Sequence, residues 1–146
     1  MTVRQAALAD LDLLVPLFDA YRQFYRQPSD LEQARTFLEA RFERNESVIF
    51  LALQEQIAIG FTQLYPSFSS GAMARIFILN DLFVTPHARR QGAASALLNA
   101  AAQYGRRAGA IRLVLSTEIT NTAAQALYER TGWVRDTVFC VYNLRL

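Results

Sequence analysis

The feature of this 146-residue chain that most constrains its fold is an apolar strand pattern that changes directly into a helical pattern. Residues 75–84, RIFILNDLFV, form an apolar run long enough for a central strand. After a short basic turn, residues 92–108 carry apolar side chains at helical spacing. Another strand-like run follows at 111–117. A strand, a helix and a strand in this order predict a sheet covered by a helix.

The residues before this unit add two helices and a hairpin. A short strand at residues 2–6 precedes an amphipathic helix over 10–27 with Asp10 as its cap, and Ser29 or Asp30 caps a second helix through residue 42. Residues 47–54 and 57–65 are β-branched and aromatic runs separated by Glu-Gln, which predicts a hairpin. Residues 66–74 have the composition of a loop.

The C-terminal residues complete the predicted fold. Residues 122–131 form a helical pattern closed by Gly132, and residues 133–146 predict one or two final strands with Cys140 in the core. One α/β domain over residues 1–146 is therefore expected, with a central mixed, mostly antiparallel sheet flanked by helices.

Composition narrows the class of protein. The chain is 52% apolar and 19% charged, which excludes a disordered chain. The net charge of +2 disfavours a nucleic-acid-binding face, and no apolar run approaches the roughly 18 residues of a membrane span. A single cysteine without a partner favours a cytoplasmic protein, and no metal-ligand spacing is present.

The turn HARRQGAASALL at residues 87–98 predicts an anion site. The first N–H groups of a helix have no intrahelical partner, and the helix dipole adds partial positive charge there. Gly92 and the alanines after it keep side chains away, so several amides together with arginine would hold an anion such as a pyrophosphate. An ordinary helix start with two solvated arginines is the alternative.

Two segments resemble the signatures of the GNAT superfamily of N-acetyltransferases. NDLFVTPHARRQGAASALL resembles the Arg/Gln-x-x-Gly-x-Gly/Ala signature after the fourth strand, met here by Arg89, Gly92 and Ala94. NTAAQALYERTGW at 121–133 is similar to the second block of the family, in the same order and at the usual separation. The resemblance implies a GNAT-like acyl-CoA N-acyltransferase fold and acetyl transfer from acetyl-CoA to a primary amine, by direct attack in a ternary complex.

The resemblance also implies which residues hold acetyl-CoA. The pyrophosphate would bind at Arg89, Arg90, Gln91, Gly92, Ala93, Ala94 and Ser95. The pantetheine arm would lie along the backbone of Leu82, Phe83 and Val84. Asn121 matches a position that hydrogen-bonds the arm, and capping of the helix that follows is an equally compatible role.

Two residues match the catalytic positions of the family. Tyr128 matches the tyrosine that protonates the departing thiolate, with aromatic packing as the alternative role. Asn80 stands where polyamine-type members carry a glutamate base and cannot accept a proton in its place. Asp81 matches the second acid, which would bind the ammonium group or take its proton through water; an ordinary strand-end carboxylate is the alternative.

The acceptor side is less defined. In this fold the first helices wall the acceptor pocket, where Tyr21, Tyr25 and Asp30 would hold a cationic amine beside Asp81; tyrosines at the edge of an amphipathic helix are the alternative. A small amine or amino-acid derivative is the first expectation, as for polyamine- and amino-acid-type members of the family, and a peptide N-terminus or protein lysine is the second. A non-catalytic acyl-CoA-binding module and a different acyl donor remain as competing hypotheses, and dimeric relatives make a homodimer an expectation.

Overall fold

Five strands form one mixed sheet, in the order β1-β2-β3-β4-β5, with the first four strands antiparallel and β5 parallel to β4. The computed structural model describes all residues, Met1–Leu146, as two compact units, Met1–Ser116 and Thr117–Leu146. The strands of the first unit are β1 Thr2–Gln5, β2 Val48–Gln54, β3 Ile57–Ser69, β4 Ala74–Val84 and β5 Leu113–Val114. Its α-helices are α1 Leu11–Phe24, α2 Leu31–Glu43 and α3 Ala93–Arg107, with short 3₁₀ turns η1 Leu8–Asp10 and η2 Pro86–Ala88. The predicted mixed, mostly antiparallel sheet is confirmed, and a single domain over 1–146 stays a prediction.

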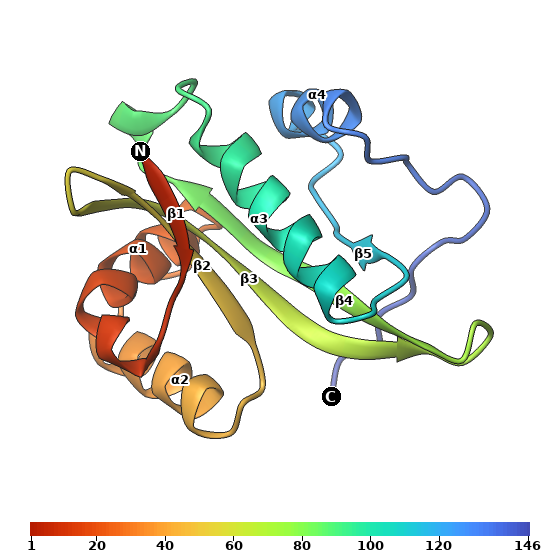
Figure 1. Ribbon diagram of the computed structural model, residues 1–146, viewed down its shortest axis with the longest axis horizontal. Helices are drawn as coiled ribbons and strands as arrows, with labels where there is room; N and C mark the ends of the chain where they lie inside the picture. The colour runs from red at the N-terminus through yellow and green to blue at the C-terminus, as the bar shows by residue number, and fades with distance from the viewer. The chain divides into compact units, whose positions relative to one another are not determined.

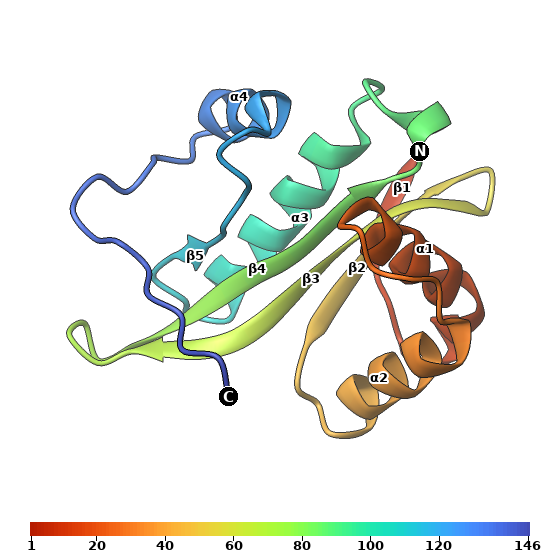
Figure 2. The ribbon, with the colours of Figure 1, turned by 180° about the vertical axis from the view of Figure 1, so that it is seen from behind.

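Helices cover both faces of the sheet. Helices α1 and α2 lie on one face and α3 on the other, as the two opposite views show (Figures 1 and 2). Leu14, Leu38 and Phe61 are fully buried on the α1–α2 side, whereas Leu97 is fully buried beside Ala52 on the α3 side. None of the helices is long and apolar enough to cross a membrane.

Both predicted hairpin strands form, but the second hairpin is longer than the sequence suggested. Glu55 and Gln56 have φ values of 49° and 68°, which is the left-handed conformation of a two-residue hairpin turn. The segment 66–74 was expected to be a loop, yet only residues 70–73 turn, because pairing continues from Pro66 with Phe77 to Ser69 with Ala74. Strand β2 pairs with β3 only as far as Leu64, so Pro66 lies where β3 has no second neighbour and its missing N–H costs no ladder bond.

A β-bulge interrupts β4 at Asn80. Gln63 of β3 pairs with Asp81, but the next residue, Leu64, pairs with Leu79, so Asn80 is the extra residue. Strand β5 pairs with β4 only at Phe77 and Ile78, two residues before the bulge. The strand expected over 111–117 is therefore only two residues long, and the edge of β4 beyond the bulge has no strand beside it.

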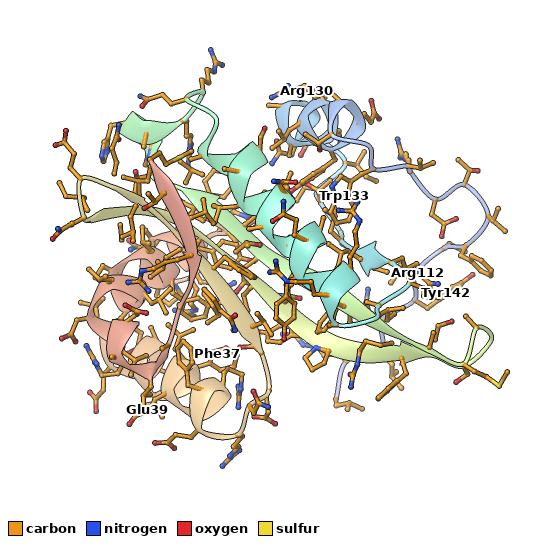
Figure 3. All side chains as sticks on the ribbon, viewed as in Figure 1. Phe37, Glu39, Arg112, Arg130, Trp133 and Tyr142 are labelled. Atoms are coloured by element: carbon orange, nitrogen blue, oxygen red, sulfur yellow. The ribbon has the colours of Figure 1, made fainter.

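Helix α4, Thr122–Arg130, belongs to the second unit and has a signal at each end. The side chain of Asn121 accepts a hydrogen bond from the N–H of Ala124 at 3.1 Å, as an N-cap does. Gly132 has a φ of 99°, and the N–H of Trp133 donates to the carbonyl of Tyr128 at 3.0 Å, which is a Schellman closure. The expected helix and both of its ends are confirmed; Figure 3 labels Arg130 and Trp133.

The predicted final strands are wrong. Residues 133–146 form neither helix nor strand. The backbone N–H groups of Val138 and Phe139 donate to the side chain of Asp136 and not to the carbonyls of a neighbouring strand. Tyr142, labelled in Figure 3, is 90% exposed, and Cys140, expected in the core, is exposed as well. The alternating apolar pattern suits a strand, but a strand also needs a partner for its backbone groups and a surface for its apolar face.

Candidate functional site

The turn between β4 and α3 presents a row of unused backbone donors. Arg90 has a φ of 62°, and Gly92, the N-cap of α3, has a φ of 89°. The N–H groups of residues 90–95 donate no hydrogen bond within the protein, and the first that does belongs to Ala96, which donates to the carbonyl of Gly92 at 3.0 Å. A Cβ added at Gly92 would meet nothing within 4 Å, so the space above the turn is open. The geometry is that of an anion site at a helix N-terminus.

The two arginines of this turn differ. The Nε of Arg89 donates to the carbonyl of Val84 at 2.9 Å, and its guanidinium carbon lies 5.4 Å from the ring centre of Phe24. Arg89 therefore ties the turn back to the end of β4, with its two terminal nitrogens left for other partners. Arg90 and His87 are exposed on the turn.

The open edge of β4 carries the backbone groups expected to bind pantetheine. The N–H of Thr85 donates to the carbonyl of Ile59 at 2.8 Å, so this position faces β3. Hydrogen-bonded and non-hydrogen-bonded positions alternate along an antiparallel pair, so the backbone groups of Val84 and Leu82 face away from β3. No strand lies on that side, so the N–H and carbonyl of Leu82 have no strand partner, while the Phe83 side chain packs in the core.

Asp81, directly after the bulge, is a buried carboxylate that is only 2% exposed. It accepts hydrogen bonds from the Nδ2 of Asn80 at 2.8 Å and from the Nε2 of Gln63 at 2.5 Å. Burial raises the pKa of Asp81, and the hydrogen bonds from Asn80 and Gln63 oppose that rise only in part. The result is a stronger base than an exposed aspartate.

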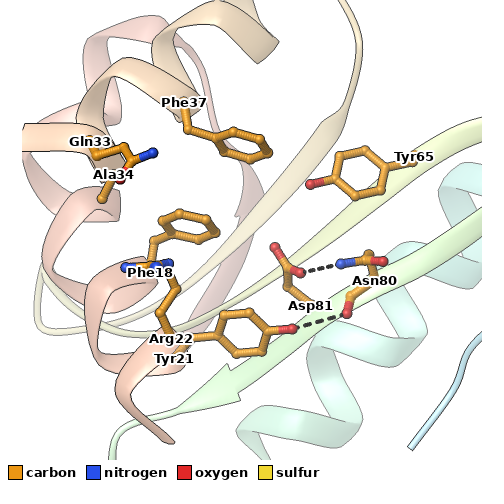
Figure 4. Close-up of a pocket in the computed structure, with 9 residues that line it drawn as sticks. All are labelled: Phe18, Tyr21, Arg22, Gln33, Ala34, Phe37, Tyr65, Asn80 and Asp81. Atoms are coloured by element: carbon orange, nitrogen blue, oxygen red, sulfur yellow. Dashed lines mark hydrogen bonds between the residues drawn. The ribbon is translucent and has the colours of Figure 1, made fainter. Parts of the chain in front are cut away.

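A cavity of about 270 Å³ opens in front of Asp81 (Figure 4). It is lined by residues of α1, α2, β3 and β4: Phe18, Tyr21, Arg22, Gln33, Ala34, Phe37, Tyr65, Asn80 and Asp81. The hydroxyl of Tyr21 donates to the Asn80 carbonyl at 3.3 Å. Burial first and the charge of Asp81 second raise the pKa of both Tyr21 and Tyr65 far above the ordinary range, so both phenols stay protonated.

The connection between α1 and α2 is organised by another buried carboxylate, Asp19. It accepts hydrogen bonds from the hydroxyl of Ser29 at 2.7 Å, the N–H of Asp30 at 2.8 Å and the Nε2 of Gln23 at 3.1 Å. The hydrogen bond from Ser29 is the main reason that the pKa of Asp19 is lowered. Asp19 thereby fixes the wall of the cavity without lining it.

The structure separates the three acceptor residues expected on this connection. Tyr21 lines the cavity. Tyr25 does not; its ring packs against Tyr21, with ring centres 5.1 Å apart. Asp30 does not line it either, because its carboxylate caps α2 by accepting from the N–H of Gln33 at 3.0 Å. Asp10, in contrast, makes no side-chain cap of α1 and instead binds Arg4 and the N–H of Ala7.

Sequence reasoning missed most of the cavity. Phe18, Phe37 and Tyr65 come from three different elements, and their spacing reveals nothing about their shared position. One signal was available: Thr62 and Gln63 are both polar within an apolar strand, which indicates a buried polar contact. In the structure the Thr62 hydroxyl donates to the Asp81 carbonyl at 2.8 Å, and Gln63 donates to the Asp81 carboxylate.

The two remaining candidates lie in the second unit. Asn121 uses its side-chain oxygen to cap α4, which confirms the capping role. The ring of Tyr128 lies 6.0 Å from that of Trp133, centre to centre. The hydrogen bond from Asn121 to the coenzyme arm and the acid role of Tyr128 stay predictions.

Comparisons with known proteins agree on one family. The model of the Acetyltransferase (GNAT) family matches residues 14–133. An uncharacterized N-acetyltransferase of Bacillus subtilis, YhfO, is 53% identical over 146 residues, which are 100% of this chain and 98% of the relative. The crystal structure of a probable acetyltransferase is 47% identical with a TM-score of 0.94, and the alignment covers 100% of this chain and 98% of that chain.

A more distant solved structure has the same fold. An aminoglycoside N-acetyltransferase in complex with coenzyme A has a TM-score of 0.84 and 20% identity, with 99% of this chain and 95% of that chain covered. At this identity the likeness is one of fold alone.

Proposed function

The chain belongs to the acetyltransferase (GNAT) family of acetyl-CoA-dependent N-acetyltransferases, and from this premise we propose that it acetylates the primary amine of a small molecule. The observation that carries the proposal is the buried Asp81 carboxylate at the end of a small cavity with aromatic walls. A volume of about 270 Å³ lies just below the roughly 300–1,000 Å³ of most ligand pockets, which favours a compact acceptor over a protein surface.

Acetyl-CoA fits the features on the α3 side of β4. The N–H groups of residues 90–95 would bind its pyrophosphate, with the terminal nitrogens of Arg89 beside them. The pantetheine arm would then follow the open edge of β4 at Leu82 and Val84. Asp81 is the neighbour of Leu82 on the same strand, so the thioester would lie near the Asp81 end of the acceptor cavity.

The acceptor must lose a proton before it can attack. An alkyl ammonium with a pKa near 10.4 is only about one part in 10³ neutral at pH 7, which is equivalent to ~4.6 kcal/mol. The charge of Asp81 would attract the ammonium into the cavity, and the raised pKa of the carboxylate would let it accept that proton, directly or through water. Asn80, which stands in the place of a glutamate, would support this role by orienting the Asp81 carboxylate.

The transfer itself exchanges one bond for another. The neutral amine attacks the thioester carbonyl, a C–N bond forms and the C–S bond breaks. The product nitrogen releases its second proton, and the departing thiolate takes up one proton to give free coenzyme A. The proposed donor to the thiolate is the phenol of Tyr128, since a positioned acid adds about 10²–10⁴-fold to such a step.

The first test is calorimetric titration with acetyl-CoA and coenzyme A, followed by thiol release with a panel of amines. We expect micromolar binding of both ligands and acetyl transfer to at least one small amine. In the Tyr128→Phe variant, turnover should fall by about 10²-fold while coenzyme A binding is kept. The control is Tyr142→Phe, because Tyr142 is 90% exposed. Binding of acetyl-CoA without transfer to any amine would instead favour a non-catalytic acyl-CoA-binding module. Asn80, which stands in the place of a glutamate base, would be compatible with that function.

A further inference from the structure

The acceptor cavity has chemically different ends. The strand end holds the Asp81 carboxylate beside Asn80, and the helix end holds the guanidinium of Arg22 from α1 and the amide of Gln33 from α2 (Figure 4). Asp81 is the one carboxylate among the nine lining residues, and Arg22 is the one cation. The lining therefore combines one negative and one positive group at opposite ends.

Arg22 keeps hydrogen-bonding capacity for a ligand. Its Nη1 donates to the carbonyl of Pro28 at 3.0 Å, which fixes the side chain and uses one of its five N–H groups. The charge of Arg22 also interacts with the carboxylate of Asp19. The Asp19 oxygens, however, are already bound by Ser29, Gln23 and the N–H of Asp30.

Aromatic rings separate the two ends. Phe18 and Phe37 are stacked with ring centres 5.7 Å apart and nearly parallel planes, and Phe18 lies 6.2 Å from Tyr21. Tyr65 forms the wall near Asp81 (Figure 4). Such walls suit an apolar spacer, and they offer no further carboxylate for a second ammonium group.

We propose that the acceptor is zwitterionic: a primary amine that binds at Asp81, an apolar spacer between the rings, and an acidic group that binds Arg22 and Gln33. An ω-amino acid with a short alkyl or aromatic spacer has this chemistry. The inference rests on the proposed acetyltransferase function and adds the substrate class. It also separates this chain from enzymes for polycationic acceptors, because a second ammonium group would meet the positive charge of Arg22.

The test compares acceptors of equal length. ω-Amino acids with four to six carbons, the diamines of the same length and the simple alkylamines, which lack a second charged group, are assayed by thiol release with acetyl-CoA, together with one aminoglycoside. We expect kcat/KM for the best amino acid to exceed that for its matched diamine by about 10-fold or more, since a hydrogen bond to a charged group contributes about 1.5–3 kcal/mol.

Three variants assign the preference to the helix end. Arg22→Gln should raise KM for the amino acid about 10- to 100-fold and change KM for the simple alkylamine less than about 2-fold. Arg22→Glu should reverse the order, so that the diamine becomes the better acceptor. Gln33→Glu adds a negative charge at the same end of the cavity and leaves the Arg22–Pro28 hydrogen bond in place. It should likewise shift the preference from the amino acid toward the diamine. Arg44→Gln, an exposed arginine at the end of α2, is the matched control and should leave the order unchanged.

Binding to the coenzyme A-loaded protein separates this inference from the proposed function. If the amino acid binds and Arg22→Gln weakens its binding, the zwitterionic site stands even where acetyl transfer is not detected, and only the enzymatic proposal fails. If amines are acetylated but diamines or aminoglycosides match the amino acids and Arg22→Gln changes nothing, the zwitterionic site is refuted and the acetyltransferase function stands. If no amine binds or reacts, both are refuted.

Discussion

Two regions of this protein, the turn proposed to bind coenzyme A (the coenzyme turn) and the cavity proposed to bind the amine (the acceptor cavity), are built from different parts of the chain. The turn at residues 89–95 is a continuous segment, and its proposed binding groups are backbone N–H groups. The cavity draws its lining from α1, α2, β3 and β4, and its proposed binding groups are side chains. A backbone site depends on the conformation of one short segment, whereas a side-chain site depends on the packing of four elements.

This difference assigns separate tasks to the two regions. The turn is proposed to bind a pyrophosphate, and such a site requires little more than small residues and a helix start. The cavity is proposed to bind the acceptor, and each lining side chain contributes to its shape and charge. Substitutions in the cavity should therefore change which amine is used, and substitutions in the turn should change how tightly coenzyme A binds.

The substitution with the largest expected effect is Asp81→Asn. If Asp81 accepts the ammonium proton, kcat/KM for the amine should fall by about 10²–10⁴-fold, while the Kd for coenzyme A changes less than about 2-fold. Steady-state kinetics and calorimetric titration measure the two quantities. A matched fall in coenzyme A binding would contradict the separation of the two regions.

The same variant should be more stable than the wild type at neutral pH. Burial raises the pKa of Asp81, so the folded protein favours the protonated carboxyl. The stability that this group contributes is present below the unfolded pKa of about 4 and is lost as the pH rises through the raised folded pKa. In thermal unfolding, the Tm of Asp81→Asn should therefore be a few degrees above that of the wild type at pH 8 and little different at pH 4.

The coenzyme turn could be predicted from the sequence because its determinants are local. The pattern predicts a helix that begins at Gly92, and Gly92 is the observed N-cap of α3. The same reasoning found the turn at Glu55 and Gln56 and the closure of α4 at Gly132. The same local reasoning failed at residues 133–146. The pattern there suits a strand, but no pattern within the segment indicates whether a partner strand lies beside it.

The cavity could be predicted only in part, because its determinants are tertiary. Asp81 was a candidate, but its pKa depends on burial that the printed sequence does not reveal. Asp30 also qualified by type, yet its carboxylate caps α2. Arg22 was not a candidate at all, because an arginine on an amphipathic helix is usually solvated. The bulge that puts Asn80 beside Asp81 is likewise visible only in the register of β3 and β4.

Ser95→Glu tests the coenzyme turn without touching the cavity. Ser95 is the third residue of α3, where a carboxylate is favourable to the helix by about 0.3–1 kcal/mol but would occupy or repel the anion site. We expect the Kd for coenzyme A to rise about 10- to 100-fold, from like-charge repulsion of about 1–3 kcal/mol, while thermal stability is kept or increased.

The matched control is Asn99→Glu, which places the same charge on an exposed position of the same helix, beyond its first turn. Calorimetric titration of both variants should show weak binding for Ser95→Glu alone. Equal weakening in the two variants would mean that net charge, rather than the backbone donors of the turn, determines the affinity.

The smallest expected effect belongs to Asp19→Asn, which acts on the cavity through its wall. The variant loses a charged acceptor for the Ser29 hydroxyl and the Asp30 N–H, so it should be less stable at pH 7 by about 1–3 kcal/mol. Because the pKa of Asp19 is lowered in the folded state, its stabilisation is present above about pH 4 and is lost as the pH falls through the folded pKa.

The free energies of unfolding of the wild type and of Asp19→Asn are measured between pH 3 and pH 8. The difference between them should shrink as the pH falls. Asp12→Asn is the control, since Asp12 pairs with Arg35 at an exposed position and should contribute no more than about 1 kcal/mol. Steady-state kinetics test whether the α1–α2 connection shapes the acceptor cavity. Asp19→Asn should raise KM for the acceptor a few-fold and leave the Kd for coenzyme A unchanged. A change in coenzyme A binding of the same size would show that the α1–α2 connection supports the turn as well, and that the two regions are not independent.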